Sequence, residues 1–214
     1  MVASEVAKYL LQIKAIKLSP QNPFTWASGL KSPIYCDNRI LLSYPTIRNE
    51  IKKKLAEKSK VLGMFNMVAG VATAGIAHGV LVADELDLPF VYVRSKAKGH
   101  GRQNQIEGEL RGNERVLVVE DLISTGGSCI QAIQPLEAMG CQIAGAIAIF
   151  SYGFDKAEKA FAEADVKHVT LSNYDALLQE AMDCNYINQS DYESLLRWRK
   201  NPSQWSEQFM ASQS

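Results

Sequence analysis

Two adjacent acidic residues stand where an apolar stretch gives way to a polar turn that contains glycine. Glu120 and Asp121 follow the apolar run 116–119, and the turn STGGS occupies 124–128. Neighbouring carboxylates can accept hydrogen bonds from vicinal hydroxyl groups of a sugar, and the turn can bind its phosphate. The segment therefore predicts a sugar-phosphate site, with the alternative that the two acids only cap the strand and the next helix.

The turn itself has the character of a phosphate cradle. It joins a predicted strand to a predicted helix, so successive backbone N–H groups and the helix dipole converge on one point. It lacks the lysine of a GxxxxGK[ST] loop and the spacing of GxGxxG, so neither a P-loop nor a dinucleotide fingerprint fits. The predicted cradle residues are Ser124, Thr125, Gly126, Gly127 and Ser128.

A second segment concentrates positive charge. The stretch 94–109 has five basic residues before its first acid, Glu107, and it contains three glycines. It indicates a cationic lid that closes over a phosphate-rich ligand, or alternatively an ordinary solvated charge run. Its basic residues are Arg94, Lys96, Lys98, His100 and Arg102.

A third segment is small and bounded by glycines. In GVATAG, at 70–75, the backbone can approach a second anionic group closely, although tight packing of a helix on a strand explains the pattern equally well. His78, which follows it, is interpreted as an ordinary core or surface histidine.

Alternating strands and helices must position these segments. Apolar patterning predicts helices at 4–17 (capped by Ser4), 45–59, 75–87, 127–139 and 154–164, with strands at 64–69, 90–93, 115–119, 142–149 and 166–171. This alternation predicts an α/β fold with a mostly parallel central sheet flanked by helices, in which ligands lie beyond the carboxyl ends of the strands. We expect a single domain over 1–214, with a core at about 45–172, a small β hood at about 20–44 and C-terminal helices at 174–212.

Composition excludes several classes of protein. The 23 basic and 23 acidic residues cancel, so we expect no nucleic-acid partner. The four cysteines are scattered and the N-terminus does not resemble a signal peptide, which favours a cytoplasmic protein. The uncharged stretch 61–83 could span a bilayer, but four glycines and its polar residues favour a buried strand, loop and helix, so we expect no membrane partner.

Four segments together carry a resemblance to a known family. VLVVEDLISTGGS resembles the binding motif for 5-phosphoribosyl-1-diphosphate (PRPP) of the type I phosphoribosyltransferases. Within that family, FTWASGLKSPIYCDNR, GVATAGI and RSKAKGHGRQNQIEG are similar to the orotate phosphoribosyltransferases. The resemblance implies transfer of the phosphoribosyl group from PRPP to orotate in pyrimidine biosynthesis, with Mg²⁺ held mainly by PRPP and not by protein side chains.

The resemblance also implies site residues and an assembly. Lys98, Asp121 and His100 match catalytic positions. The implied PRPP-binding residues are Arg94, Lys98, His100, Glu120, Asp121, Ser124, Thr125, Gly126, Gly127, Ser128, Thr73, Ala74 and Gly75. The implied orotate-binding residues are Lys31, Tyr35, Cys36 and Thr125. A homodimer follows, with the lid 94–109 shared between subunits, and in relatives the segment around Thr73 often contains a non-proline cis peptide.

The sequence also departs from some relatives. Ala27, Ala74 and Ser95 stand where some orotate enzymes have lysine, and FSYGFDK lacks an arginine that contacts the orotate carboxylate. We expect Lys31 to meet that carboxylate instead. Two other functions stay open: transfer to a purine or another base, and a sensor that binds PRPP or a nucleotide without turnover.

Overall fold

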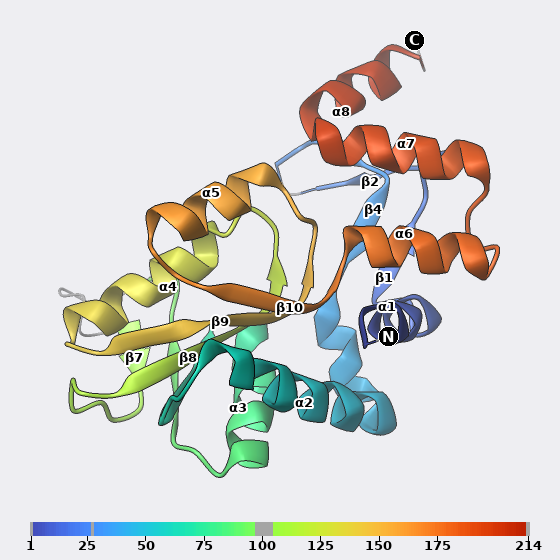
Figure 1. Ribbon diagram of the computed structural model, residues 1–214. Helices are drawn as coiled ribbons and strands as arrows, with labels where there is room; N and C mark the ends of the chain where they lie inside the picture. Colours follow the sequence, from blue (N-terminus) through green and yellow to red (C-terminus); the bar gives the residue numbers. More distant parts are fainter. Residues whose placement is uncertain (1, 27, 97–104, 213–214) are drawn as a thin grey trace.

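The computed structural model describes residues 2–26, 28–96 and 105–212 (Figure 1). A six-stranded sheet crosses the molecule, and every neighbouring pair is parallel except the last, β6 with β7. The predicted fold class is therefore confirmed. In spatial order the strands are β10 (His168–Asn173), β9 (Gln142–Ser151), β8 (Arg115–Ile123), β5 (Met67–Val71), β6 (Phe90–Val93) and β7 (Ile106–Glu107).

Helices cover both faces of the sheet, which explains why its central strands are continuously apolar. In β8, Val116 and Val118 belong to the core formed with α4 (Gly127–Ala138) and α5 (Asp155–Glu163). Leu117 and Val119 face the opposite core, which contains residues of α2 (Pro45–Ser59) and α3 (Ala74–Leu86). In Figure 1, α4 and α5 lie on one side of the sheet, and α2 and α3 lie on the other.

The N-terminal segment corrects one prediction. Helix α1 spans Val2–Gln12, so Ser4 lies inside it and does not cap it, and the predicted end at residue 17 is wrong. The helix stops because Lys14 adopts a left-handed conformation with φ of 58°. Residues Ile16–Leu18 then form β1, which pairs antiparallel with β4 (Ile34–Cys36). A second short pair, β2 (Phe24–Thr25) with β3 (Lys31–Ser32), completes the predicted hood.

Two core strands extend further than the sequence predicts. Strand β8 runs to Ile123 and β9 runs to Ser151, because the two strands keep pairing up to these residues. The predicted strand at 64–69 lies at Met67–Val71, and the short strand β7 falls inside the predicted lid. Two 3-10 helices, η1 (Asn38–Ser43) and η2 (Lys60–Leu62), flank α2.

The C-terminal part consists of three helices that pack on the hood side of the sheet (Figure 1). They are α6 (Tyr174–Asp183), α7 (Gln189–Lys200) and α8 (Pro202–Ala211). Helix α7 begins with a capping box between Asn188 and Asp191. Trp198 is fully buried and Trp205 is almost so, which confirms both as packing residues.

None of the helices in the described ranges has the length and apolar composition needed to cross a membrane. The uncharged stretch 61–83 divides between the end of η2, the buried strand β5 and most of α3. His78 on α3 is buried, as expected of a core histidine, and burial lowers its pKa to about 4.

Candidate active site

The two acidic residues lie within the last part of β8, beyond the point where β5 stops pairing with it. The β5 register ends at Gly70 opposite Val119, whereas β9 continues to pair with β8 as far as Ile123. The backbone therefore holds Glu120 and Asp121 in extended conformation at the open carboxyl edge of the sheet. The interpretation of these residues as mere strand caps is wrong, because the strand does not end at them.

Burial and mutual repulsion dominate the chemistry of this pair. Glu120 is 5% exposed, and its carboxylate accepts hydrogen bonds from the Asp121 backbone N–H (3.2 Å) and the Ser128 hydroxyl (3.4 Å). Burial, followed by the neighbouring Asp121 charge, raises the pKa of Glu120 to about 9. Burial also raises the pKa of Asp121. At neutral pH the unliganded pair therefore retains a proton.

This raised pKa makes stability depend on pH in a defined direction. Between its ordinary pKa of 4.5 and about 9, Glu120 ionises in the unfolded chain but not in the folded protein, so the wild type loses stability as the pH rises. Glu120→Gln stays neutral in both states. As the pH rises through this window, we expect the free energy of unfolding of Glu120→Gln, relative to that of the wild type, to increase by up to about 1.4 kcal/mol per pH unit. Urea unfolding of both proteins at about pH 5 and about pH 8 measures the change, and an equal difference at both pH values would contradict it.

The predicted phosphate cradle begins helix α4. Gly126 is the N-cap residue, with a left-handed φ of 78°, and among the described residues no side chain caps the helix N-terminus. The backbone N–H groups of the first turn are therefore left for an anion. Thr125 and Ser128 are exposed beside them, and Ser124 is half-buried.

The glycine-bounded segment lies against the same strand. The Ala72–Thr73 peptide bond is cis, which confirms the non-proline cis peptide that the resemblance implied for this segment, and Thr73 is the N-cap residue of α3. A Cβ added to Gly75 would lie 2.5 Å from the carbonyl oxygen of Val119 and 3.4 Å from Glu120 Oε1. The close packing of helix on strand is thus confirmed for Gly75, and it brings Thr73, Ala74 and Gly75 next to the acidic pair.

At the base of the predicted lid, the residue that begins it is bonded to residues near its end. The Arg94 N–H donates to the Gln105 carbonyl (2.8 Å), and Arg94 Nη1 lies 3.2 Å from Glu107 Oε1. A hollow of about 30 Å³ separates this base from the cradle and is lined by residues that include Ala72, Arg94 and Ser128. Lys98 and His100 lie outside the described residues.

The hood reaches the acidic pair through a residue that the sequence analysis did not single out. The Asn38 side chain is fully buried and donates from Nδ2 to the Asp121 carbonyl oxygen (2.8 Å). Cys36 Sγ lies 3.5 Å from Asn38 Oδ1, so this orotate-binding candidate is close to Asp121. Tyr35 is 39% exposed and packs on Phe24. The sequence offered no signal for Asn38, because its contact with Asp121 joins residues 83 positions apart.

Lys31 lies on β3, in the other two-stranded pair of the hood. Its ammonium donates to the Thr25 hydroxyl at 2.9 Å, and its backbone N–H donates to the Ser206 hydroxyl of α8 at 2.9 Å. Its role in binding orotate stays a prediction.

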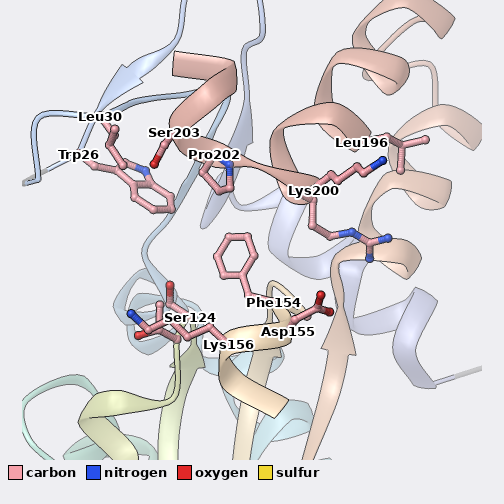
Figure 2. Close-up of a pocket in the computed structure, with 13 residues that line it drawn as sticks. Trp26, Leu30, Ser124, Phe154, Asp155, Lys156, Leu196, Lys200, Pro202 and Ser203 are labelled. Carbon is pink, nitrogen blue, oxygen red and sulfur yellow. The ribbon is translucent and has the colours of Figure 1, made fainter. Parts of the chain in front are cut away.

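A cavity of about 870 Å³ joins the cradle to the hood and the C-terminal helices (Figure 2). Figure 2 shows Phe154 standing between Ser124 on one side and Pro202 on the other. The sequence analysis did not assign most of this lining a role in the site. The lining residues are Trp26, Leu30, Ser124, Thr125, Gly153, Phe154, Asp155, Lys156, Leu196, Arg199, Lys200, Pro202 and Ser203.

Comparison with known proteins agrees with this geometry. Residues 39–183 match the phosphoribosyl transferase domain family. An orotate phosphoribosyltransferase of Listeria innocua is 54% identical over 95% of this chain and 98% of that protein. One from Porphyromonas gingivalis is 53% identical over 94% and 96%. The crystal structure of the Aeropyrum pernix orotate phosphoribosyltransferase superposes with a TM-score of 0.73 at 28% identity, over 86% of this chain and 99% of that one. The chain therefore belongs to the phosphoribosyltransferase-domain family and, within it, to the orotate phosphoribosyltransferases.

Proposed function

We propose that this chain transfers the 5-phosphoribosyl group from PRPP to orotate, giving orotidine 5′-monophosphate and pyrophosphate. The observation that carries the proposal is that the buried Glu120 and the half-buried Asp121 stand at the end of β8, shortly before the N-terminus of helix α4. Asp121 and Glu120 would accept hydrogen bonds from the ribose hydroxyls, and the cradle 124–128 would bind the 5′-phosphate.

The leaving group sets the main catalytic demand. Breaking the bond between sugar and diphosphate builds negative charge on the diphosphate, which preorganised cations and N–H donors stabilise. Lys98, His100 and Arg94 are assigned to this role, together with the backbone of Thr73, Ala74 and Gly75. Orotate is already an anion at neutral pH through its carboxylate. The proton that its ring nitrogen loses on bond formation can pass to the departing diphosphate, and a closed lid would exclude water from the cation-like sugar.

Mg²⁺ is the proposed cofactor. In the described ranges, His, Cys, Asp and Glu side chains do not form a group of three or more that could hold a metal ion. Mg²⁺ often binds through substrate phosphates and only one or two carboxylates, so the residues present fit an ion that arrives with PRPP. When bound, Mg²⁺ neutralises charge on the diphosphate oxygens.

The proposed reaction is tested by the loss of orotate ultraviolet absorbance when the purified protein meets PRPP and Mg²⁺. Parallel reactions contain uracil, adenine or hypoxanthine, and a further control omits PRPP. We expect loss with orotate only. Reaction with a purine alone would show that the acceptor base is a purine and not orotate. PRPP binding without turnover of any base would favour a sensor.

The proposed assembly is a homodimer in the cytoplasm, in which each lid serves the neighbouring subunit. Cys36, Cys129, Cys141 and Cys184 are unpaired, which supports a reducing compartment.

Mixing two inactive variants tests the shared lid. We expect Lys98→Ala and Asp121→Asn, mixed in equal amounts, to recover up to about a quarter of the wild-type activity, because half of randomly formed dimers are mixed and each then has one intact site. Subunit exchange is verified with differently tagged chains. Complete exchange without recovered activity would place each site within a single chain.

A further inference from the structure

The cavity beside the cradle has the composition of a site for a planar anion. Trp26 and Phe154 provide aromatic surface, and Ser124 and Thr125 connect the cavity to the cradle where the 5′-phosphate is proposed to bind. Orotate is a flat ring that carries a carboxylate, and moving a carboxylate out of water requires a cation or several N–H donors. The relevant question is therefore which cation faces this cavity.

Among the described residues that line the cavity, three are cationic: Lys156, Arg199 and Lys200. Lys156 and Lys200 are exposed, whereas the Arg199 side chain is only 28% exposed. A partly buried guanidinium interacts more strongly with an anion than an exposed ammonium does, because solvent screens it less. Arg199 is thus the best placed of the three.

Helix α6 holds the Arg199 side chain in position. Its Cζ lies 5.4 Å from the centre of the Tyr174 ring, and its Nη1 lies 2.8 Å from Asp175 Oδ1. Tyr174 is itself fully buried and donates from its hydroxyl to the Leu195 carbonyl (3.0 Å), which ties α6 to α7. A guanidinium has five N–H donors, so the pairing with Asp175 leaves others for a ligand. Holding the side chain in place reduces the conformational entropy lost on binding.

The Arg199 guanidinium lies close to Gly153, just beyond the end of β9. Gly153 follows Ser151 with a left-handed φ of 66°, and a Cβ at Gly153 would lie 4.0 Å from Arg199 Nη1. The side chain of Arg199 therefore reaches the carboxyl end of the sheet from outside it, beside the segment FSYGFDK. The family match covers 39–183, so Arg199 belongs to a part of the chain outside that match.

From these contacts we propose that Arg199 of helix α7 binds the carboxylate of orotate and thereby selects orotate over bases that lack a carboxylate. The proposal rests on the proposed function, because it takes orotate as the substrate. It assigns the role expected of Lys31 to another residue: the Lys31 ammonium is engaged with Thr25, and Lys31 is not among the described residues that line the cavity.

Steady-state kinetics of Arg199→Gln, with Asp175→Asn as the matched control, test the proposal. Both variants break the same ion pair, but only Arg199→Gln removes the cation. For Arg199→Gln we expect KM for orotate to rise about tenfold or more, KM for PRPP to change little, and the preference for orotate over uracil to fall by a similar factor. Asp175→Asn keeps KM for orotate close to the wild-type value. Lys31→Ala is assayed in parallel, and a loss of the orotate-to-uracil preference in Lys31→Ala but not in Arg199→Gln would overturn the inference.

The outcomes separate this inference from the proposed function. A wild-type protein that does not use orotate would overturn the proposed function itself. With an active wild type, an unchanged KM for orotate in Arg199→Gln overturns the inference. An equal rise in Asp175→Asn also overturns it, since Arg199 would then act only through the packing of α6 on α7. If Arg199→Gln does not fold, Arg199→Lys takes its place. Lysine lacks the planar guanidinium, so this variant must still raise KM for orotate without a similar rise in KM for PRPP.

Discussion

We expect turnover to fall about a hundredfold or more when Lys98 is replaced by alanine, because the role proposed for Lys98 is to stabilise the charge that develops on the departing diphosphate. The effect falls mainly on kcat, since the interaction is stronger with the leaving diphosphate than with bound PRPP. Initial rates of orotate consumption at saturating PRPP and Mg²⁺ measure it.

A second lysine in the same segment provides the matched comparison. Lys96 is exposed and belongs to the same run of positive charge as Lys98. Lys96→Ala removes one unit of charge from the segment and therefore reports how much of the loss comes from overall charge. Equal losses in the two variants, or unchanged turnover in Lys98→Ala, would remove the specific role of Lys98.

Gly75→Ala is expected to destabilise the fold and abolish most activity. The added Cβ would lie 2.5 Å from the Val119 carbonyl oxygen and 3.2 Å from Glu120 Cα, and both are backbone atoms that cannot rotate away. Helix α3 must then move off strand β8, at a cost of about 1–3 kcal/mol typical of overpacking. The same movement displaces Thr73 and Ala74 from the acidic pair. Thermal unfolding and PRPP-dependent turnover measure the two consequences.

Gly127→Ala is the matched stability control for this change. Within the part of the chain that the structure describes, a Cβ at Gly127 would meet only Thr125 Oγ1, at 3.8 Å, which is an ordinary contact. Its melting temperature should stay near the wild-type value, whereas that of Gly75→Ala should fall by several degrees. If both variants have the melting temperature of the wild type, the close approach of α3 to β8 does not constrain the site.

Local patterns predicted the core elements but not their ends. The apolar run 116–119 identified β8 correctly, yet its continuation through Glu120 and Asp121 depends on pairing with β9, which is distant in sequence. Likewise, the apolar spacing in 4–17 does not reveal that Lys14 turns the chain and that Ile16 enters a strand. Tertiary pairing outweighs local preference at such boundaries.

The candidate site shows the same division. The cradle and the acidic pair are contiguous in sequence, so the motif could be recognised directly. Asn38 reaches Asp121 across 83 positions, and Arg199 approaches Gly153 from a separate helix. Spacing along the chain carries no signal for contacts of this kind. The sequence therefore favoured Lys31 as the residue that meets the orotate carboxylate, because Lys31 lies in the recognisable hood segment.

The walls of the large cavity come from opposite ends of the chain. Trp26 and Leu30 precede the central sheet, and Leu196, Pro202 and Ser203 follow it, whereas the cradle directly follows strand β8 at the centre of the sheet (Figure 2). On the proposed function, substitutions in the hood or in α7 and α8 would change the part of the lining that faces the base and leave the cradle residues unchanged.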